Sequence, residues 1–226
     1  MKKLAIALLF LSLSIPATSL PRHPGKSEQR KASHRIEFTV PEDSLTDEQL
    51  FPSADGKGAC SASALGPHAL LTAQHCDVGE EYLTVDLELS PRKIVGRITD
   101  GEDHIIFLVN GSKFKATMAA EYDPTTYALP TVGEKVFLFG DGRAMYPPQY
   151  RNGYYTGTAK IEDGDASKDP DVFLFDLNII PGDSGSAVYG DGGKLVTLIT
   201  YSMGGKFAGC YKMAFTEAQI AQAEAF

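Results

Sequence analysis

Short apolar or alternating segments, separated by Gly, Pro, Asp and Asn, dominate the chain from Ile36 onward. Runs of this length and pattern are typical of β-strands joined by tight turns. We expect strands at 36–40, 69–73, 82–89, 94–98, 105–109, 113–118, 135–139, 154–161, 172–177, 186–189, 195–201 and 207–215. Because no helical segments alternate with these strands, the pattern predicts an all-β sandwich or pair of barrels and argues against a doubly wound α/β sheet.

The last segment differs, since its pattern predicts a helix over residues 216–226. Thr216 with Gln219 three positions later is a capping box, in which the two side chains satisfy backbone groups at the helix start. Glu217 places a negative charge at the positive end of the helix dipole. Alanine, a strong helix former, recurs through the rest of the segment. We therefore expect a C-terminal helix that packs on the β body.

Residues 1–19 have the pattern of a signal peptide. Lys2 and Lys3 precede the apolar run Leu4–Leu13, and small residues lead up to Ser19. The run is shorter than the roughly 20 apolar residues that cross a bilayer. We expect cleavage near Ser19, a secreted or periplasmic protein, and no stable membrane anchor; the alternative is an uncleaved anchor.

Residues 20–35 are rich in basic residues, Ser and Pro and contain few large apolar side chains. Such a segment cannot form a core by itself and is predicted to be a flexible arm or a pro-segment. The remaining residues, 36–226, are enough for one ordinary domain or two closely packed half-domains.

The charge of the chain argues against nucleic acid as a partner. The formal net charge is −8, and an acidic surface repels phosphate groups. The sequence has no P-loop, dinucleotide-binding or zinc-protease motif, and we expect no cofactor. It has three cysteines, Cys60, Cys76 and Cys210, without the short Cys-x-x-Cys spacing of zinc sites. We therefore expect no metal, and one cysteine left over or paired with another chain.

The run Pro181–Ser186 contains a candidate nucleophile, Ser184. A serine hydroxyl needs a base that removes its proton and donors that stabilise the oxyanion. Gly182 has no side chain to block a tight turn, so the N–H groups of Gly182 and Ser184 can converge on one oxygen. Taken alone, the run is also compatible with a surface turn.

The candidate base is His75, which ends the apolar segment 69–73 and is followed at once by Cys76. A histidine at the exit of a strand can face a cleft, although a single histidine is more often part of the core. Together, the runs Thr72–Cys76 and Gly182–Gly185 resemble the histidine and serine boxes of the chymotrypsin-like (trypsin-fold) serine proteases. The resemblance extends from about Ile36 to the C-terminus.

This resemblance implies two six-stranded antiparallel β-barrels, the first at about 36–120 and the second at about 130–215. The catalytic site would lie between them, with His75 from the first barrel and Ser184 from the second. It also implies a disulfide between Cys60 and Cys76, where the family has its histidine-loop disulfide. In the loop-entropy model such a disulfide stabilises by about 3 kcal/mol.

The acid of the triad lies between His and Ser in this family, at the head of an apolar strand. Asp103, which precedes the strand at 105–109, fits that place and would orient His75. Asp100 and Glu102 lie close by, and Asp86 is the next candidate. The alternative is that Asp103 is a solvated loop carboxylate.

The order of these residues argues against other hydrolase folds. In α/β-hydrolases the histidine follows the serine, but no histidine follows Ser184 here. A subtilisin-type order needs an acid before His75, such as Asp55, on an α/β scaffold that the pattern does not indicate.

Substrate preference is weakly encoded. Counting back from Ser184 places Asn178 near the base of the family's primary pocket, without an acid for a Lys or Arg side chain. Thr200, Tyr201 and Ser202 resemble the segment that pairs with the substrate backbone. We expect specificity unlike that of trypsin. A newly cut N-terminus after Arg35 is a conceivable partner for Asp183, although many bacterial members need no such cut.

We therefore expect a monomeric, exported serine endopeptidase that acts on polypeptides. Two alternatives remain: a binding protein on the same fold without catalysis, and an exported esterase with the same triad.

Overall fold

The structure, a computed structural model, describes residues 26–39, 57–117, 129–142, 147–160, 171–203 and 207–226. The predicted signal peptide, residues 1–19, lies outside them. The elements in chain order are α1 (Ser27–Ala32), β1 (Ser33–Thr39), β2 (Lys57–Gly66), β3 (Ala69–Ala73), a 3-10 turn η2 (Gln74–Cys76), β4 (Tyr82–Val85), β5 (Arg92–Thr99), β6 (His104–Val109), β7 (Lys135–Gly140), β8 (Gln149–Lys160), β9 (Asp171–Asp176), β10 (Ala187–Gly190), β11 (Leu195–Leu198), β12 (Tyr201–Met203), β13 (Phe207–Tyr211) and α2 (Glu217–Ala225).

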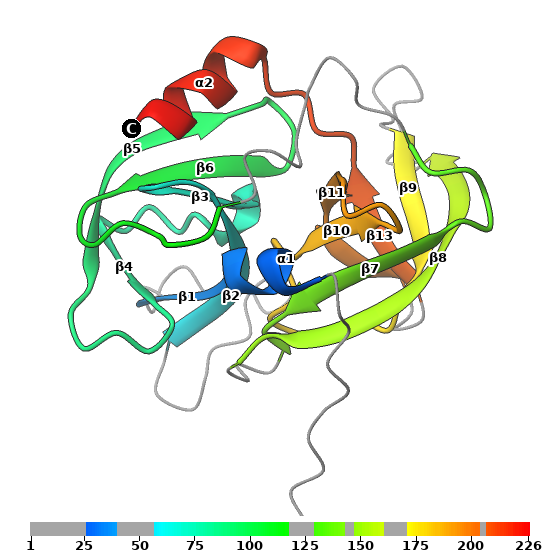
Figure 1. Cartoon of the computed structure of the whole chain (residues 1–226), viewed down its shortest axis with the longest axis horizontal. Helices are drawn as coiled ribbons and strands as arrows, with labels where there is room; N and C mark the ends of the chain where they lie inside the picture. The colour runs from blue at the N-terminus through cyan, green and yellow to red at the C-terminus, as the bar shows by residue number, and fades with distance from the viewer. Residues whose placement is uncertain (1–25, 40–56, 118–128, 143–146, 161–170, 204–206) are drawn as a thin grey trace, which may run out of the picture.

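The first half of the chain forms a closed barrel of six strands in the order β1-β2-β3-β6-β5-β4 (Figure 1). β1 pairs with β2 on one side and with β4 on the other, which closes the ring. Inside the barrel lie buried side chains such as Ile36, Leu70 and Phe107. Burial of such apolar surface is the main favourable term in folding.

The second half is a seven-stranded sheet in the order β11-β10-β7-β8-β9-β13-β12. Its two edge strands, β11 and β12, are separated in the chain only by Ile199 and Thr200, so the sheet curls back on itself. At these two residues the backbone changes partners: Ile199 bonds with Gly185 and Ser186, and Thr200 with Gly209. The double-barrel architecture is therefore confirmed, but the second unit is a curled seven-stranded sheet and not a closed barrel of six strands.

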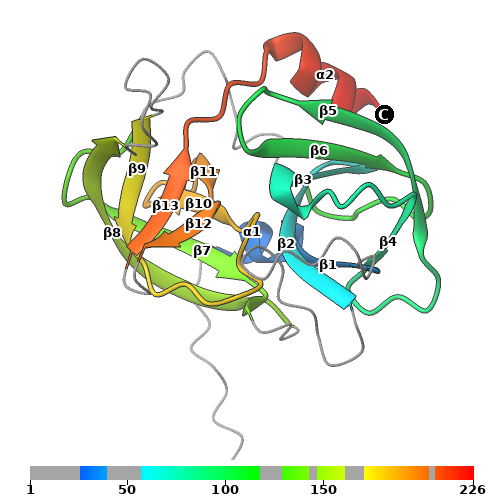
Figure 2. The ribbon, with the colours of Figure 1, turned by 180° about the vertical axis from the view of Figure 1, so that it is seen from behind.

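A core between the two halves joins them into one body. It includes Leu71 and Ile106 from the first barrel, and Phe137 and Tyr189 from the second sheet. The Phe137 and Tyr189 rings stack with their centroids 5.2 Å apart. Figure 2 shows the two sheets side by side, with α1 between them.

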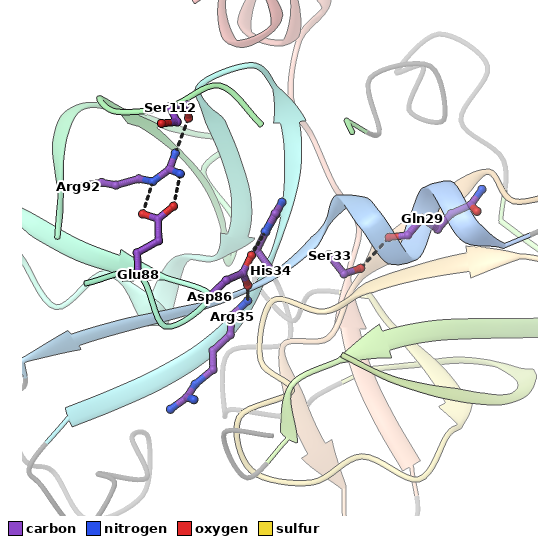
Figure 3. Close-up of polar contacts among 8 residues, drawn as sticks. All are labelled: Gln29, Ser33, His34, Arg35, Asp86, Glu88, Arg92 and Ser112. Carbon is purple, nitrogen blue, oxygen red and sulfur yellow. Dashed lines mark hydrogen bonds and ion pairs between the residues drawn. The ribbon is translucent and has the colours of Figure 1, made fainter. Parts of the chain in front are cut away.

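The expectation of a flexible arm over residues 20–35 is wrong for residues 27–35, which form α1 and the start of β1. Ala32 is buried in the core between the halves, and the Ser33 hydroxyl donates to the carbonyl oxygen of Gln29 (Figure 3). The Lys26 ammonium lies 3.6 Å from the centroid of the Phe137 ring, a favourable cation–π contact. The contacts of Lys26 and Ala32 are with distant strands and have no counterpart in local composition. Residues 20–25 lie outside the described residues.

The strands differ from the predicted ones at two places. The sequence pattern does not indicate β2, because its Gly, Ala and Ser residues have low strand propensity. This strand forms because it pairs with β1 and β3. The strand expected at 113–118 is absent from residues 113–117, the part that the structure describes. Phe114 is instead buried, and its amide bonds the Pro67 carbonyl.

The predicted C-terminal helix and its capping box are confirmed in α2. The Thr216 hydroxyl accepts from the amide of Gln219, and the Gln219 side chain accepts from the amide of Thr216. The helix follows the second sheet but packs on the first barrel, beside β5 (Figure 1). There Ile220 and Ala223 are buried. Gly66 has no room for a side chain, since a Cβ would overlap the Ala223 carbonyl. Among the described residues, no helix has the length and apolar character needed to cross a membrane.

The predicted disulfide between Cys60 and Cys76 is confirmed. It joins β2 to the turn that carries His75, and it closes a loop of 16 residues. Cys210 is free and buried in the second sheet.

We predict that the double variant Cys60→Ser/Cys76→Ser loses about 3 kcal/mol of unfolding free energy, because an uncrosslinked unfolded chain gains loop entropy. Urea unfolding without reductant measures the difference. As a control, wild-type protein reduced with dithiothreitol should unfold at the urea concentration of the variant. A variant as stable as the oxidised wild type contradicts the prediction.

Candidate active site

His75 and Asp103 come from the ends of two neighbouring strands. β3 pairs with β6 so that Ala73 lies opposite His104, which places the turn after β3 beside the loop before β6. The amide of Gln74 bonds the Asp103 carbonyl at 3.1 Å. Strand pairing therefore brings His75 and Asp103 together, although they are 28 residues apart in the sequence.

The side chains of these two residues form a hydrogen-bonded pair. One Asp103 carboxylate oxygen accepts from the His75 amide at 2.9 Å, and the other lies 2.8 Å from Nδ1 of the imidazole. Because an ionised carboxylate can only accept, Nδ1 carries the proton and Nε2 keeps a free lone pair. Both side chains are about one-fifth exposed, at 20% and 23%. The hydrogen bond to Asp103 thus orients the imidazole.

The other candidate acids are engaged elsewhere. Asp100 bonds the imidazole of His104 at 2.8 Å and the amide of Ala214 at 2.9 Å. Burial raises the pKa of Asp100, but these hydrogen bonds outweigh burial and hold it below its ordinary value. Asp86 bonds His34 and the amide of Arg35 (Figure 3). Neither carboxylate is hydrogen-bonded to His75.

Two tight turns in succession build the loop that contains Ser184. The amide of Asp183 bonds the Ile180 carbonyl at 3.0 Å, and that of Ser186 bonds the Asp183 carbonyl at 2.8 Å. The third residues of the turns, Gly182 and Gly185, have φ of 94° and 82°. A positive φ at this position defines a type II turn and favours glycine, and proline is common just before it. The sequence Pro-Gly-Asp-Ser-Gly-Ser therefore sets the local shape of the loop.

This loop belongs to the second half but contacts the first barrel directly. A Cβ on Gly185 would overlap the Thr72 hydroxyl and the Ser61 carbonyl, and would lie 3.0 Å from the Ala73 amide nitrogen. The amide of Ser61 also bonds the Ser184 carbonyl at 2.8 Å. The structure thus brings the Ser184 loop against the end of β3, two residues before His75.

The two predicted oxyanion donors are unoccupied by other groups. Within the part of the chain that the structure describes, the amides of Gly182 and Ser184 have no hydrogen-bond partner. Their carbonyls, in contrast, accept from the hydroxyl and the amide of Ser61. The two amides are therefore free to donate to a ligand.

Asp183 is paired within the protein by Arg151 of β8, a residue that sequence reasoning missed. Both terminal nitrogens of the guanidinium donate to the two carboxylate oxygens, and the Ile180 amide adds a bond of 2.7 Å. Burial raises the pKa of Asp183, and the bonds from Arg151 oppose this shift. The Asp183 carboxylate is thus paired in this structure without a newly cut N-terminus, and Ile36 is buried within β1. No local pattern around Arg151 signals the pairing.

The residues expected at the substrate side are distributed around this loop. Thr200 follows Ile199, whose carbonyl accepts from the amide of Gly185 at 2.8 Å. Tyr201 and Ser202 belong to the edge strand β12, which pairs only with β13 among the described residues. Asn178 is exposed, and its carbonyl accepts from Arg151 at 3.3 Å. Thr200 thus directly follows a residue that bonds the loop, and the substrate-binding role of Thr200, Tyr201 and Ser202 stays a prediction.

Tyr201 narrows the space beside β12. Its ring lies across Gly209 of β13, where a Cβ would overlap the ring carbons. The Tyr201 and Tyr211 rings lie 5.7 Å apart. An open hollow of about 490 Å³ is lined by Gln74, His75, Gly101, Glu102, Asp103 and Tyr211. Among the described residues, no group of three His, Cys, Asp or Glu side chains is arranged to hold a metal ion.

Asp141 is a second buried carboxylate near the loop. It follows β7, is 1% exposed, and its amide bonds the Ser61 hydroxyl at 2.9 Å. Among the described residues, neither carboxylate oxygen has a hydrogen-bond partner. Burial raises the pKa of Asp141 to about 7; the charge of Asp86 adds to this rise, and that of Arg35 opposes it.

No protein-family model and no curated protein sequence matches this chain. Solved structures do match. The active form of the Rv3671c protease from M. tuberculosis has a TM-score of 0.64 at 13% identity, with 88% of this chain and 82% of that chain covered. The HtrA-type protease AlgW with a decapeptide has a TM-score of 0.59 at 16% identity, with 88% and 65% covered. The MamO protease domain from Magnetospirillum magneticum has a TM-score of 0.57 at 16% identity, with 83% and 94% covered.

These neighbours are serine proteases of the trypsin fold. At such low identity the likeness shows the fold, and it confirms the predicted chymotrypsin-like double barrel.

We predict that Asp141→Asn makes the protein less sensitive to pH. The pKa of the Asp141 carboxyl group is higher in the folded chain than in the unfolded chain, so the folded chain binds the proton more tightly. Between about pH 4 and the folded pKa, the stability gained from this proton is therefore lost as the pH rises. The variant should therefore gain stability relative to wild type from pH 4 to pH 8, measured by urea unfolding.

Asp191→Asn is the matched control, because it removes the same charge from an exposed turn. Its difference from wild type should hardly change with pH. A difference for Asp141→Asn that is equally constant over pH 4–8 contradicts the prediction.

Proposed function

We propose that the protein is a serine endopeptidase with Ser184 as nucleophile, His75 as base and Asp103 as the orienting acid. The observation that carries the proposal is the His75–Asp103 pair beside the loop of Ser184, which contacts the same strand end. The fold shared with solved serine proteases supports a protease.

In this mechanism, Ser184 Oγ attacks the carbonyl carbon of the scissile peptide while its proton passes to Nε2 of His75. The oxyanion accepts hydrogen bonds from the amides of Gly182 and Ser184. His75 then gives the proton to the leaving amine, which leaves an acyl-enzyme. A water molecule, deprotonated by His75, hydrolyses the acyl-enzyme and restores Ser184.

The substrate is proposed to be a polypeptide in extended conformation. The edge strand β12, with Tyr201 and Ser202, can pair with such a chain through main-chain hydrogen bonds. The Tyr201 ring over Gly209 leaves little room on this side, and Asn178 carries no charge. The lack of an acid at Asn178 favours an uncharged residue before the scissile bond, and not the Lys or Arg that trypsin selects, while the limited room favours a small one.

The proposal includes export and independence of cofactors. Residues 1–19 would act as a cleaved signal peptide and deliver a monomer to the periplasm or the exterior. The disulfide between Cys60 and Cys76 fits an oxidising compartment. The Arg151–Asp183 pair supports activity without a cut at Arg35.

We predict that a fluorophosphonate probe labels the purified protein and does not label Ser184→Ala, because only an activated serine reacts with it. Ser186→Ala, which changes the neighbouring serine, should still be labelled. Digestion of a peptide library should then show cleavage within peptides. Labelling without peptide cleavage, but with cleavage of simple esters, indicates an esterase; no labelling of the folded wild type overturns the catalytic proposal.

We predict that Asp103→Asn lowers kcat about 10⁴-fold with little loss of stability, because an amide cannot hold the imidazole in the required tautomer. Glu102→Gln, which removes an exposed carboxylate next to it, should retain activity. The two variants are compared with the best peptide from the library. An Asp103→Asn enzyme with unchanged turnover would show that another group orients His75.

A further inference from the structure

Ser61 is the residue through which the first barrel holds the loop of Ser184. It lies in β2 next to the disulfide cysteine Cys60 and is 1% exposed. Its amide donates to the Ser184 carbonyl at 2.8 Å, and its carbonyl accepts from the Thr72 hydroxyl at 2.7 Å. The amide and the carbonyl of Ser61 are therefore both hydrogen-bonded.

The direction of the Ser61 side-chain bonds is fixed by chemistry. The amide of Asp141 can only donate, so the Ser61 hydroxyl accepts there, at 2.9 Å. A hydroxyl has one proton, and this proton is then available for the Gly182 carbonyl, also at 2.9 Å. Ser61 thus joins β7, through Asp141, to the first turn of the Ser184 loop.

Gly182 depends on this bond more than another residue would. Glycine has the widest range of backbone conformations, and Gly182 has a positive φ of 94°. In the described part of the chain, its carbonyl is the only backbone group of Gly182 with a hydrogen-bond partner. The peptide unit that contains this carbonyl is also held by the Asp183 amide, which bonds Ile180. Loss of the Ser61 hydroxyl would remove one of its two anchors, so the Gly182 N–H would be held less firmly in its direction.

We propose that Ser61 is a positioning residue for the oxyanion site: its hydroxyl fixes the Gly182 carbonyl, and thereby the Gly182 N–H, while its amide fixes Ser184 from the other side. This inference rests on the proposed catalytic function. The residue does not touch substrate in this role. It acts by keeping two donors aligned before the reaction, which is the main requirement of electrostatic stabilisation.

The test compares Ser61→Ala with Ser63→Ala. Ser63 lies two residues further along β2 and is equally buried at 1%, and within the described ranges its hydroxyl has no hydrogen-bond partner. Both changes remove one buried hydroxyl from the same strand. The readout is the time course of labelling by the fluorophosphonate probe over a range of probe concentrations, which gives the maximal rate kinact and the half-saturating concentration KI separately.

We expect kinact of Ser61→Ala to fall at least about tenfold. This fall should be smaller than the loss of about 10²–10³-fold that follows removal of an oxyanion donor itself. KI should stay within about twofold, because the donors act on the transition state. The pH midpoint of labelling should not move, since His75 and Asp103 are untouched. Ser63→Ala should label at the wild-type rate, and Ser61→Thr, which keeps a hydroxyl, should recover most of the loss.

Near-ultraviolet circular dichroism and thermal unfolding show whether each variant is folded. If Ser61→Ala does not fold, Ser61→Val serves instead, because it has the shape of the Ser61→Thr variant without the hydroxyl. Folded Ser61→Ala or Ser61→Val with the kinact of Ser63→Ala overturns the inference. Failure of wild type to label is a different result, since it overturns the proposed function.

Discussion

The contact between the Ser184 loop and the first barrel is the constraint on which the rest of the site depends. Gly185 lies so close to Thr72 and Ser61 that any side chain would overlap them, and its φ of 82° is one that glycine adopts without strain. Because the loop lies directly on β2 and β3, the position of Ser184 is set relative to the strand end that carries His75. The halves can hold a common site only while this contact is intact.

The buried charges around this contact differ in how they are compensated. Asp183 has a bidentate partner in Arg151, and Asp100 has the His104 imidazole. Paired in this way, a buried carboxylate can remain ionised. Among the described residues, no group hydrogen-bonds the carboxylate oxygens of Asp141, so its ionisation costs stability. The Ser184 loop thus contains one well-paired carboxylate, Asp183, and lies near an unpaired one, Asp141.

The similarity to solved proteases at 13–16% identity follows from the same geometry. Few side chains are needed to keep two curled sheets together, because many combinations of apolar residues fill a core to the same volume. The positions with little freedom are those where backbones approach closely, such as Gly185 and Gly66. A fold of this kind can persist after most of its residues have changed.

Local chemistry alone determined much of this protein. The alternating segments predicted most strands, Thr216 with Gln219 predicted the start of α2, and the glycines after Pro181 and Ser184 predicted tight turns. These signals act over a few residues, within which propensity and hydrogen bonding are decided.

Tertiary structure decided the rest. β2 has weak strand propensity and forms because two strands pair with it, and α1 is ordered by side chains more than 100 residues away. Arg151 and Ser61 contact the loop only because distant strands bring them there. Strand pairing and buried ion pairs depend on which residues lie opposite one another in the folded chain. The local sequence pattern does not identify these neighbours.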